Sequence, residues 1–132
     1  GHTADAAEQL AEELRTKGQQ VVVMDLARCD MAEAVAQAFR FSKLVLATPT
    51  YNADVFPFMK DFINHLTERN YQNRTVAFIE NGSWAPMAAK VMRKMLENSK
   101  ALTFADTTVT VKGALNDASE AQIAALADEL SK

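Results

Sequence analysis

The sequence predicts an α/β domain of three layers, with helices on both faces of an open parallel sheet. Short apolar runs alternate with longer amphipathic segments in the order α-β-α-β-α-β-α-β-α, which is typical of βα units with right-handed crossovers. The apolar runs are five to seven residues long, as expected for strands buried on both faces. No linker, low-complexity segment or internal repeat interrupts the chain, so we expect a single domain over residues 1–132.

The first half of the chain supplies two predicted helices and two predicted strands. Apolar residues at helical spacing predict a helix over 3–17, which Gly18 can end. The β-branched run QVVVMDL predicts a strand over 20–26. A second apolar helical face predicts a helix over 31–40, and the run KLVLA predicts a buried strand over 43–47.

The second half repeats the same alternation. Large apolar residues predict a helix over 57–67, and the run RTVAFIE predicts a strand over 74–80. A proline near the first turn and methionines on one face predict a helix over 86–98. The run TTVTVKG predicts a strand over 107–113, and a last apolar helical face covers 118–131. Because this order begins with a helix, whereas such a domain should begin with a strand, we expect that the first strand is missing from this chain.

Composition narrows the class of function. The formal net charge of −3 provides no basic face for a nucleic acid. No apolar run approaches the roughly 20 residues that span a bilayer. The single cysteine, Cys29, excludes an internal disulfide, and together with a polar, acidic opening segment it favours a reducing cytoplasm.

Ligands of open α/β sheets bind beyond the carboxyl ends of the strands, and three segments fall there. The first is Gly1, His2 and Thr3, at the start of the first predicted helix. Glycine allows close approach of the backbone, and a threonine hydroxyl beside free N–H groups suits an anion. The alternative interpretation is an ordinary helix N-cap.

The second segment follows the strand at 43–47 and consists of Thr48, Pro49, Thr50, Tyr51 and Asn52. Proline favours an extended backbone at the residue before it. Hydroxyls, an amide and an aromatic ring on one loop suit a planar heterocycle. The alternative interpretation is a turn that uses proline and asparagine for its geometry.

The third segment follows the strand at 74–80 and contains Asn81, Gly82, Ser83, Trp84 and Ala85. Glycine and serine allow the backbone to curve around a flat ligand, and the only tryptophan of the chain could stack on it. The alternative interpretation is a tryptophan that folds back into the core. Together, the three segments indicate one elongated, phosphate-bearing heteroaromatic ligand.

These loops resemble those of flavodoxin and, more closely, of the flavodoxin-like domain of A-type flavoproteins, the flavodiiron proteins. The phosphate loop of that family reads Ser/Thr-x-Tyr-Gly-Asn-Thr, and residues 1–3 match its last three positions with His2 in place of Asn. The next loop reads Ser/Thr-Pro-Thr-x-Asn followed by Phe-Pro, which residues 48–52 and 56–57 match. The third reads Gly-Ser-x-Gly-Trp, and residues 82–84 keep it in a shorter form.

The resemblance implies the sheet order 2-1-3-4-5, FMN as cofactor and electron transfer to a redox partner. That partner would be a diiron domain, rubredoxin or a reductase. It also implies a head-to-tail homodimer of the full-length protein. The chain itself offers only two histidines, His2 and His65, without a cluster that could hold two irons, so we expect no metal site and no catalytic centre of its own.

Other functions fit the sequence less well. A response-regulator receiver domain needs an acceptor aspartate at the end of its third strand, where this chain has LATPTYN. Nothing reads as a nicotinamide site, which a flavin reductase would need. One alternative stays open: a cofactor-free module for interaction or assembly, consistent with the incomplete phosphate loop.

Overall fold

The computed structural model describes residues 2–49, 57–81 and 88–132. It has five helices in these ranges: α1 (His2–Thr16), α2 (Met31–Arg40), α3 (Pro57–Glu68), α4 (Ala88–Leu96) and α5 (Asp117–Leu130). The strands in these ranges are β1 (Lys43–Pro49), β2 (Arg74–Asn81), β3 (Leu102–Phe104) and β4 (Val109–Val111). Each predicted helix is confirmed within two residues at its described ends. Gly18 follows α1 with a φ of 84°, as expected where a helix stops.

The described strands form one parallel sheet with β2 at its centre. β1 pairs with β2 along its whole length, from Lys43 opposite Thr75 to Pro49 opposite Asn81. On the other side of β2, β3 pairs with its beginning and β4 with its end. The strand predicted over 107–113 therefore exists as the short β4. The short strand β3, which was not predicted, pairs with the same side of β2.

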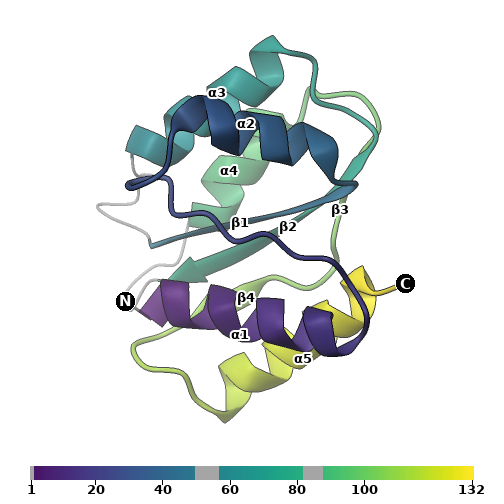
Figure 1. Cartoon of the computed structure of the whole chain (residues 1–132). Coiled ribbons are helices and arrows are strands. Elements are labelled where there is room, and N and C mark those ends of the chain that lie inside the picture. The colour runs from purple at the N-terminus through teal and green to yellow at the C-terminus, as the bar shows by residue number, and fades with distance from the viewer. Residues whose placement is uncertain (1, 50–56, 82–87) are drawn as a thin grey trace.

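Helices cover both faces of this sheet, which gives the predicted three layers (Figure 1). α2, α3 and α4 lie on one face, and α1 and α5 lie on the other. Successive residues of β2 point to opposite faces: Val76 and Phe78 belong to the core under α2–α4, whereas Ala77 and Ile79 belong to the core under α1 and α5. One strand thus supports two separate apolar cores.

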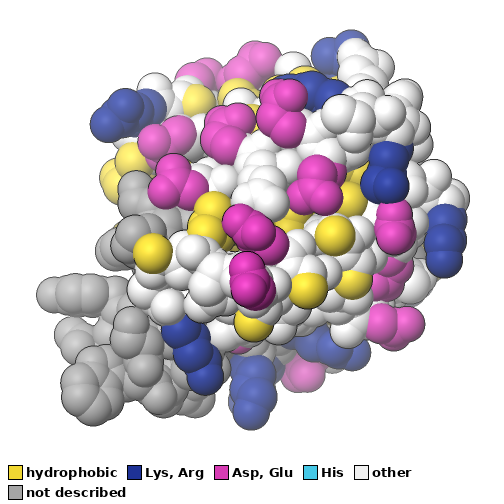
Figure 2. Space-filling view, turned by 90° about the horizontal axis from the view of Figure 1, so that it is seen from below, with side chains coloured by type: hydrophobic (Ala, Val, Ile, Leu, Met, Phe, Trp, Pro, Cys, Tyr) yellow, Lys and Arg dark blue, Asp and Glu magenta, His cyan; other side chains and the backbone are white. Residues whose placement is uncertain are grey.

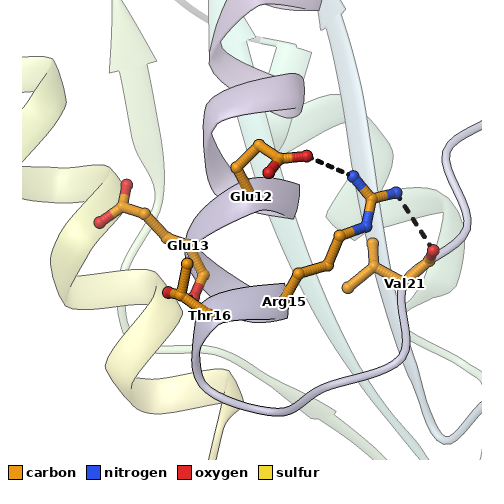
Figure 3. A network of polar contacts seen from close by, with 5 residues as sticks. All are labelled: Glu12, Glu13, Arg15, Thr16 and Val21. Atoms are coloured by element: carbon orange, nitrogen blue, oxygen red, sulfur yellow. Dashed lines mark hydrogen bonds and ion pairs between the residues drawn. The ribbon is translucent and has the colours of Figure 1, made fainter.

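Residues 20–26 do not form the predicted strand; they run without strand pairing between α1 and α2. A β-branched run becomes a strand only when a neighbouring strand satisfies its backbone groups, and this segment has none among the described residues. It is held to α1 by Arg15, whose guanidinium donates to the Val21 carbonyl oxygen at 3.3 Å and to Glu12 at 2.7 Å (Figure 3). The side chains of Val22 and Val23 remain 45 % and 42 % exposed.

A groove of about 740 Å³ separates this segment from β1. Its walls are mostly apolar and come from residues 19–27, β1 and the inner faces of α1 and α2. β1 pairs on one side only within the described residues, so its other edge faces this groove. The segment crosses the molecule in the same direction as β1 (Figure 1). The groove therefore lies where the expected first strand would sit between 20–26 and β1.

The outer face of α1 and α5 is acidic. Figure 2 shows Asp and Glu side chains spread across it, with Lys and Arg toward its margins. Exposed carboxylates on the two helices include Asp5, Glu8, Glu12, Asp117 and Glu120. This face would repel a phosphate backbone, which argues against nucleic-acid binding there. No helix in the described part of the chain is long and apolar enough to cross a membrane.

Candidate functional site

The carboxyl edge of the sheet brings the three predicted segments together. β1 and β2 end side by side, because Pro49 is the register partner of Asn81. The N-terminus of α1 lies at this same edge (Figure 1). The segments that follow β1 and β2 in the chain therefore start next to each other and near the first turn of α1.

Five of the predicted site residues belong to described elements at this edge. Thr3 lies in the first turn of α1 and Thr48 is the next-to-last residue of β1, and His2, Pro49 and Asn81 are placed as ends of α1, β1 and β2. The other predicted site residues lie outside the described residues: Gly1, Thr50, Tyr51, Asn52, Gly82, Ser83, Trp84 and Ala85. Their contacts with a ligand stay predictions.

Thr3 has the features of an anion-binding residue. Its side chain is 7 % exposed, and its hydroxyl has no hydrogen-bond partner among the described residues. Thr3 lies within the first turn of α1 rather than before it, and its hydroxyl makes no capping hydrogen bond to a described residue. The first N–H groups of a helix also lack partners within it and carry a partial positive charge. A phosphate oxygen would satisfy both kinds of donor, so these residues fit the phosphate end of the expected ligand.

A row of polar side chains, of which two are buried and one is partly buried, crosses the sheet just beneath the carboxyl edge. Thr48, Glu80 and Thr110 are successive register partners on β1, β2 and β4. Their side chains point to the face covered by α3 and α4, and those of Thr48 and Glu80 are 2 % and 7 % exposed. The Glu80 carboxylate accepts the backbone N–H of Ala89 and the hydroxyl of Thr110, each at 3.0 Å.

Sequence reasoning missed Glu80 as a functional candidate. Glu80 ends the run RTVAFIE, and a carboxylate at the end of an otherwise largely apolar buried strand is unusual. That charge at a strand end was the available signal. In the described ranges 2–49, 57–81 and 88–132, no three His, Cys, Asp or Glu side chains gather as a metal site.

Comparison with known proteins identifies the family. A sequence model of flavodoxin matches residues 1–127. A search of the curated proteins found no match. Among solved structures, rubredoxin oxygen:oxidoreductase from Desulfovibrio gigas, an A-type flavoprotein, superposes with a TM-score of 0.89 at 21 % identity. The match covers 98 % of this chain but only 32 % of that one.

Two flavodoxins superpose over nearly their full length. The flavodoxin of Streptococcus pneumoniae TIGR4 gives a TM-score of 0.83 at 20 % identity, covering 99 % of this chain and 90 % of that one. Flavodoxin 1 of Bacillus cereus gives 0.83 at 15 % identity, covering 98 % and 88 %. These likenesses confirm the flavodoxin-like fold, and the family match over 127 residues confirms the resemblance that the loops predicted. The chain therefore belongs to the flavodoxin family.

Proposed function

We propose that this chain is an FMN-binding electron-transfer domain. The observation that supports it best is the hydroxyl of Thr3 in the first turn of α1, which is buried beside the ends of β1 and β2 and has no hydrogen-bond partner among the described residues. When bound, FMN supplies the redox chemistry, and the protein supplies binding, orientation and electrostatics. Thr3 and the first N–H groups of α1 would hold the phosphate. The predicted partners of the flavin ring are Tyr51, Asn52 and Trp84.

The domain would pass electrons to a partner rather than transform a substrate. The described residues hold no cluster of potential metal ligands, so a diiron domain, rubredoxin or a reductase would have to take up or deliver the electrons. The Desulfovibrio gigas chain is about three times as long as the matched part, which leaves room there for such a further domain. A head-to-tail homodimer and a cytoplasmic location complete the proposal; the location is supported by the single cysteine.

The phosphate role of Thr3 can be tested by titrating FMN and following its fluorescence. Thr3→Val keeps the shape of the side chain but removes the hydroxyl. It should weaken binding roughly 10- to 150-fold, because a hydrogen bond to a charged group contributes about 1.5–3 kcal/mol. Thr3→Ser should restore most of the affinity.

Thr16 offers a matched control at the other end of α1, where its hydroxyl donates to the Glu13 carbonyl oxygen at 2.7 Å (Figure 3). Thr16→Val should leave the affinity for FMN unchanged. Equal affinities of wild type and Thr3→Val would refute the phosphate role. A wild-type protein that is colourless and does not titrate would refute FMN binding altogether.

The groove along β1 favours the second candidate, a cofactor-free module for interaction or assembly. We propose that the groove receives a β-strand parallel to β1. No described strand pairs with the edge of β1 that faces the groove, which supports a strand as the occupant, because an extended backbone can satisfy a row of N–H and C=O groups. If assembly is the whole function, the strand will bind and FMN will not.

A further inference from the structure

Glu80 is a buried carboxylate at a position where the fold alone does not require a charge. It is the next-to-last residue of β2, and its side chain is 7 % exposed. Burying a charge is unfavourable unless hydrogen bonds compensate for the lost water. An apolar residue would suit the rest of this strand, since Val76 and Phe78 point to the same face.

Its two oxygens bind two different elements. One accepts the N–H of Ala89, in the first turn of α4, at 3.0 Å. Within α4 as the structure describes it, that N–H has no partner, and a carboxylate at a helix N-terminus is stabilised by the helix dipole. The other oxygen accepts the Thr110 hydroxyl on β4, also at 3.0 Å. Glu80 thus fastens the ends of β2 and β4 and the beginning of α4 to one another.

These are the two ends of the chain segment that joins β2 to α4. We infer that Glu80 is a positioning residue, which fixes both ends of the segment carrying the predicted flavin partner Trp84. This inference rests on the proposed FMN binding. This role differs from a purely stabilising one. Removing the Glu80 carboxylate should weaken FMN binding more than a mutation elsewhere that lowers the free energy of unfolding by the same amount.

Glu129 provides a matched control for that distinction. It too is a glutamate whose oxygens accept two hydrogen bonds, from the N–H groups of Asp106 and Thr107 in the segment between β3 and β4, at 2.7 and 3.1 Å. It belongs to the C-terminal end of α5, at the opposite side of the molecule from the start of α1 (Figure 1). Glu129→Ala should reduce stability but leave the affinity for FMN unchanged.

The experiment measures FMN affinity together with amide hydrogen exchange of the FMN-free protein. Glu80→Ala should raise the Kd for FMN about tenfold, equivalent to about 1.4 kcal/mol, and speed exchange in the first turn of α4. Glu80→Gln should retain most of the affinity, because its amide can still accept from Ala89 and donate to Thr110. If Glu80→Ala does not fold, Thr110→Val, which removes one of the two bonds, should show a smaller loss of affinity.

The outcomes separate the two proposals. If the wild-type protein does not bind FMN, the proposed function fails. In that case, unchanged amide hydrogen exchange at the start of α4 in Glu80→Ala would show that Glu80 does not position this part of the chain. If Glu80→Ala and Glu129→Ala weaken FMN binding equally, the role of Glu80 is only stabilising and the inference is wrong. Faster exchange at α4 with a selective loss of affinity supports it.

Discussion

Completing the sheet is the perturbation with the largest expected effect. We consider a variant that carries a six-residue Val/Ile strand and a short Gly-Ser link ahead of Gly1. The N-terminus of α1 lies at the carboxyl edge (Figure 1), which is where a strand parallel to β1 would end. A few linking residues would therefore be enough to place the added strand in the 740 Å³ groove.

The size of the effect follows from the edge of β1 that faces the groove, where no described strand pairs with it. About half of the backbone groups of its seven residues face the groove, and about six new hydrogen bonds at roughly 0.5–1.5 kcal/mol each are available. Ordering six residues costs about 1–2 kcal/mol each, so the backbone terms nearly cancel. Burial of three Val or Ile side chains at about 1.5–3 kcal/mol each decides the sign. We expect a net stabilisation of about 3 kcal/mol, which raises Tm by roughly 10 °C.

Thermal unfolding followed by circular dichroism measures this shift. The control is the same extension with two prolines in its centre, because proline cannot donate to the ladder of a central strand. The same six-residue Val/Ile sequence, added as a separate peptide at micromolar concentration, should raise Tm far less. Association of two molecules costs about 4–15 kcal/mol in lost translational and rotational freedom, which the linked strand avoids. An unchanged Tm, or equal shifts with the Val/Ile and proline extensions, would show that the groove does not take up a strand.

Three other side chains give separate tests. Arg74→Met removes donations to the carbonyl oxygens of Phe39 and Phe41 at 2.6 and 3.2 Å; it should lower the free energy of unfolding in urea by about 2–4 kcal/mol, and an unchanged midpoint would contradict this. Burial raises the pKa of Tyr71 from 10.0 to about 12, although Arg74 acts in the opposite direction. The unfolded chain ionises first, so stability should fall between pH 10 and 12, and Tyr71→Phe should remove that fall in thermal melts. Partial burial alone would raise the pKa of Glu129, but the backbone N–H groups that it accepts lower it overall. Its contribution should therefore be present at neutral pH and be lost as pH falls through this lowered pKa, and an acid titration of Glu129→Gln should lack that component.

The fold could be predicted wherever local pattern and tertiary packing agree. The helix over 31–40 has the bounds that its apolar face predicts. The strand predicted over 43–47 begins where expected and continues two residues further, to Pro49. Residues 20–26 have an equally strong β pattern but lack a strand to pair with among the described residues, and no local signal reveals that. β3 was missed because three residues are too short to show a period.

The site was predicted where residue types reveal their chemistry. Thr3 could be selected from its place at a helix start, and the structure adds that its hydroxyl is buried and that no described residue forms a hydrogen bond with it. The role of Glu80 depends on Ala89 and on Thr110, which lies 30 residues away in the chain. A single sequence does not show which strand will bring a hydroxyl to a given carboxylate, so this contact had to come from the structure.

The central position of β2 also determines how the molecule opens. β2 alone among the described strands has neighbours on both sides, and both apolar cores rest on it. Opening it locally would disrupt both helix layers at once, whereas detaching residues 20–26 would break the Arg15 contact and expose only Val21, Met24 and Leu26, which are partly buried against the two cores. Local opening should therefore begin at the margin beside β1 and reach β2 only on global unfolding. The molecule is thus least protected along the groove margin, where an incoming strand would have to enter.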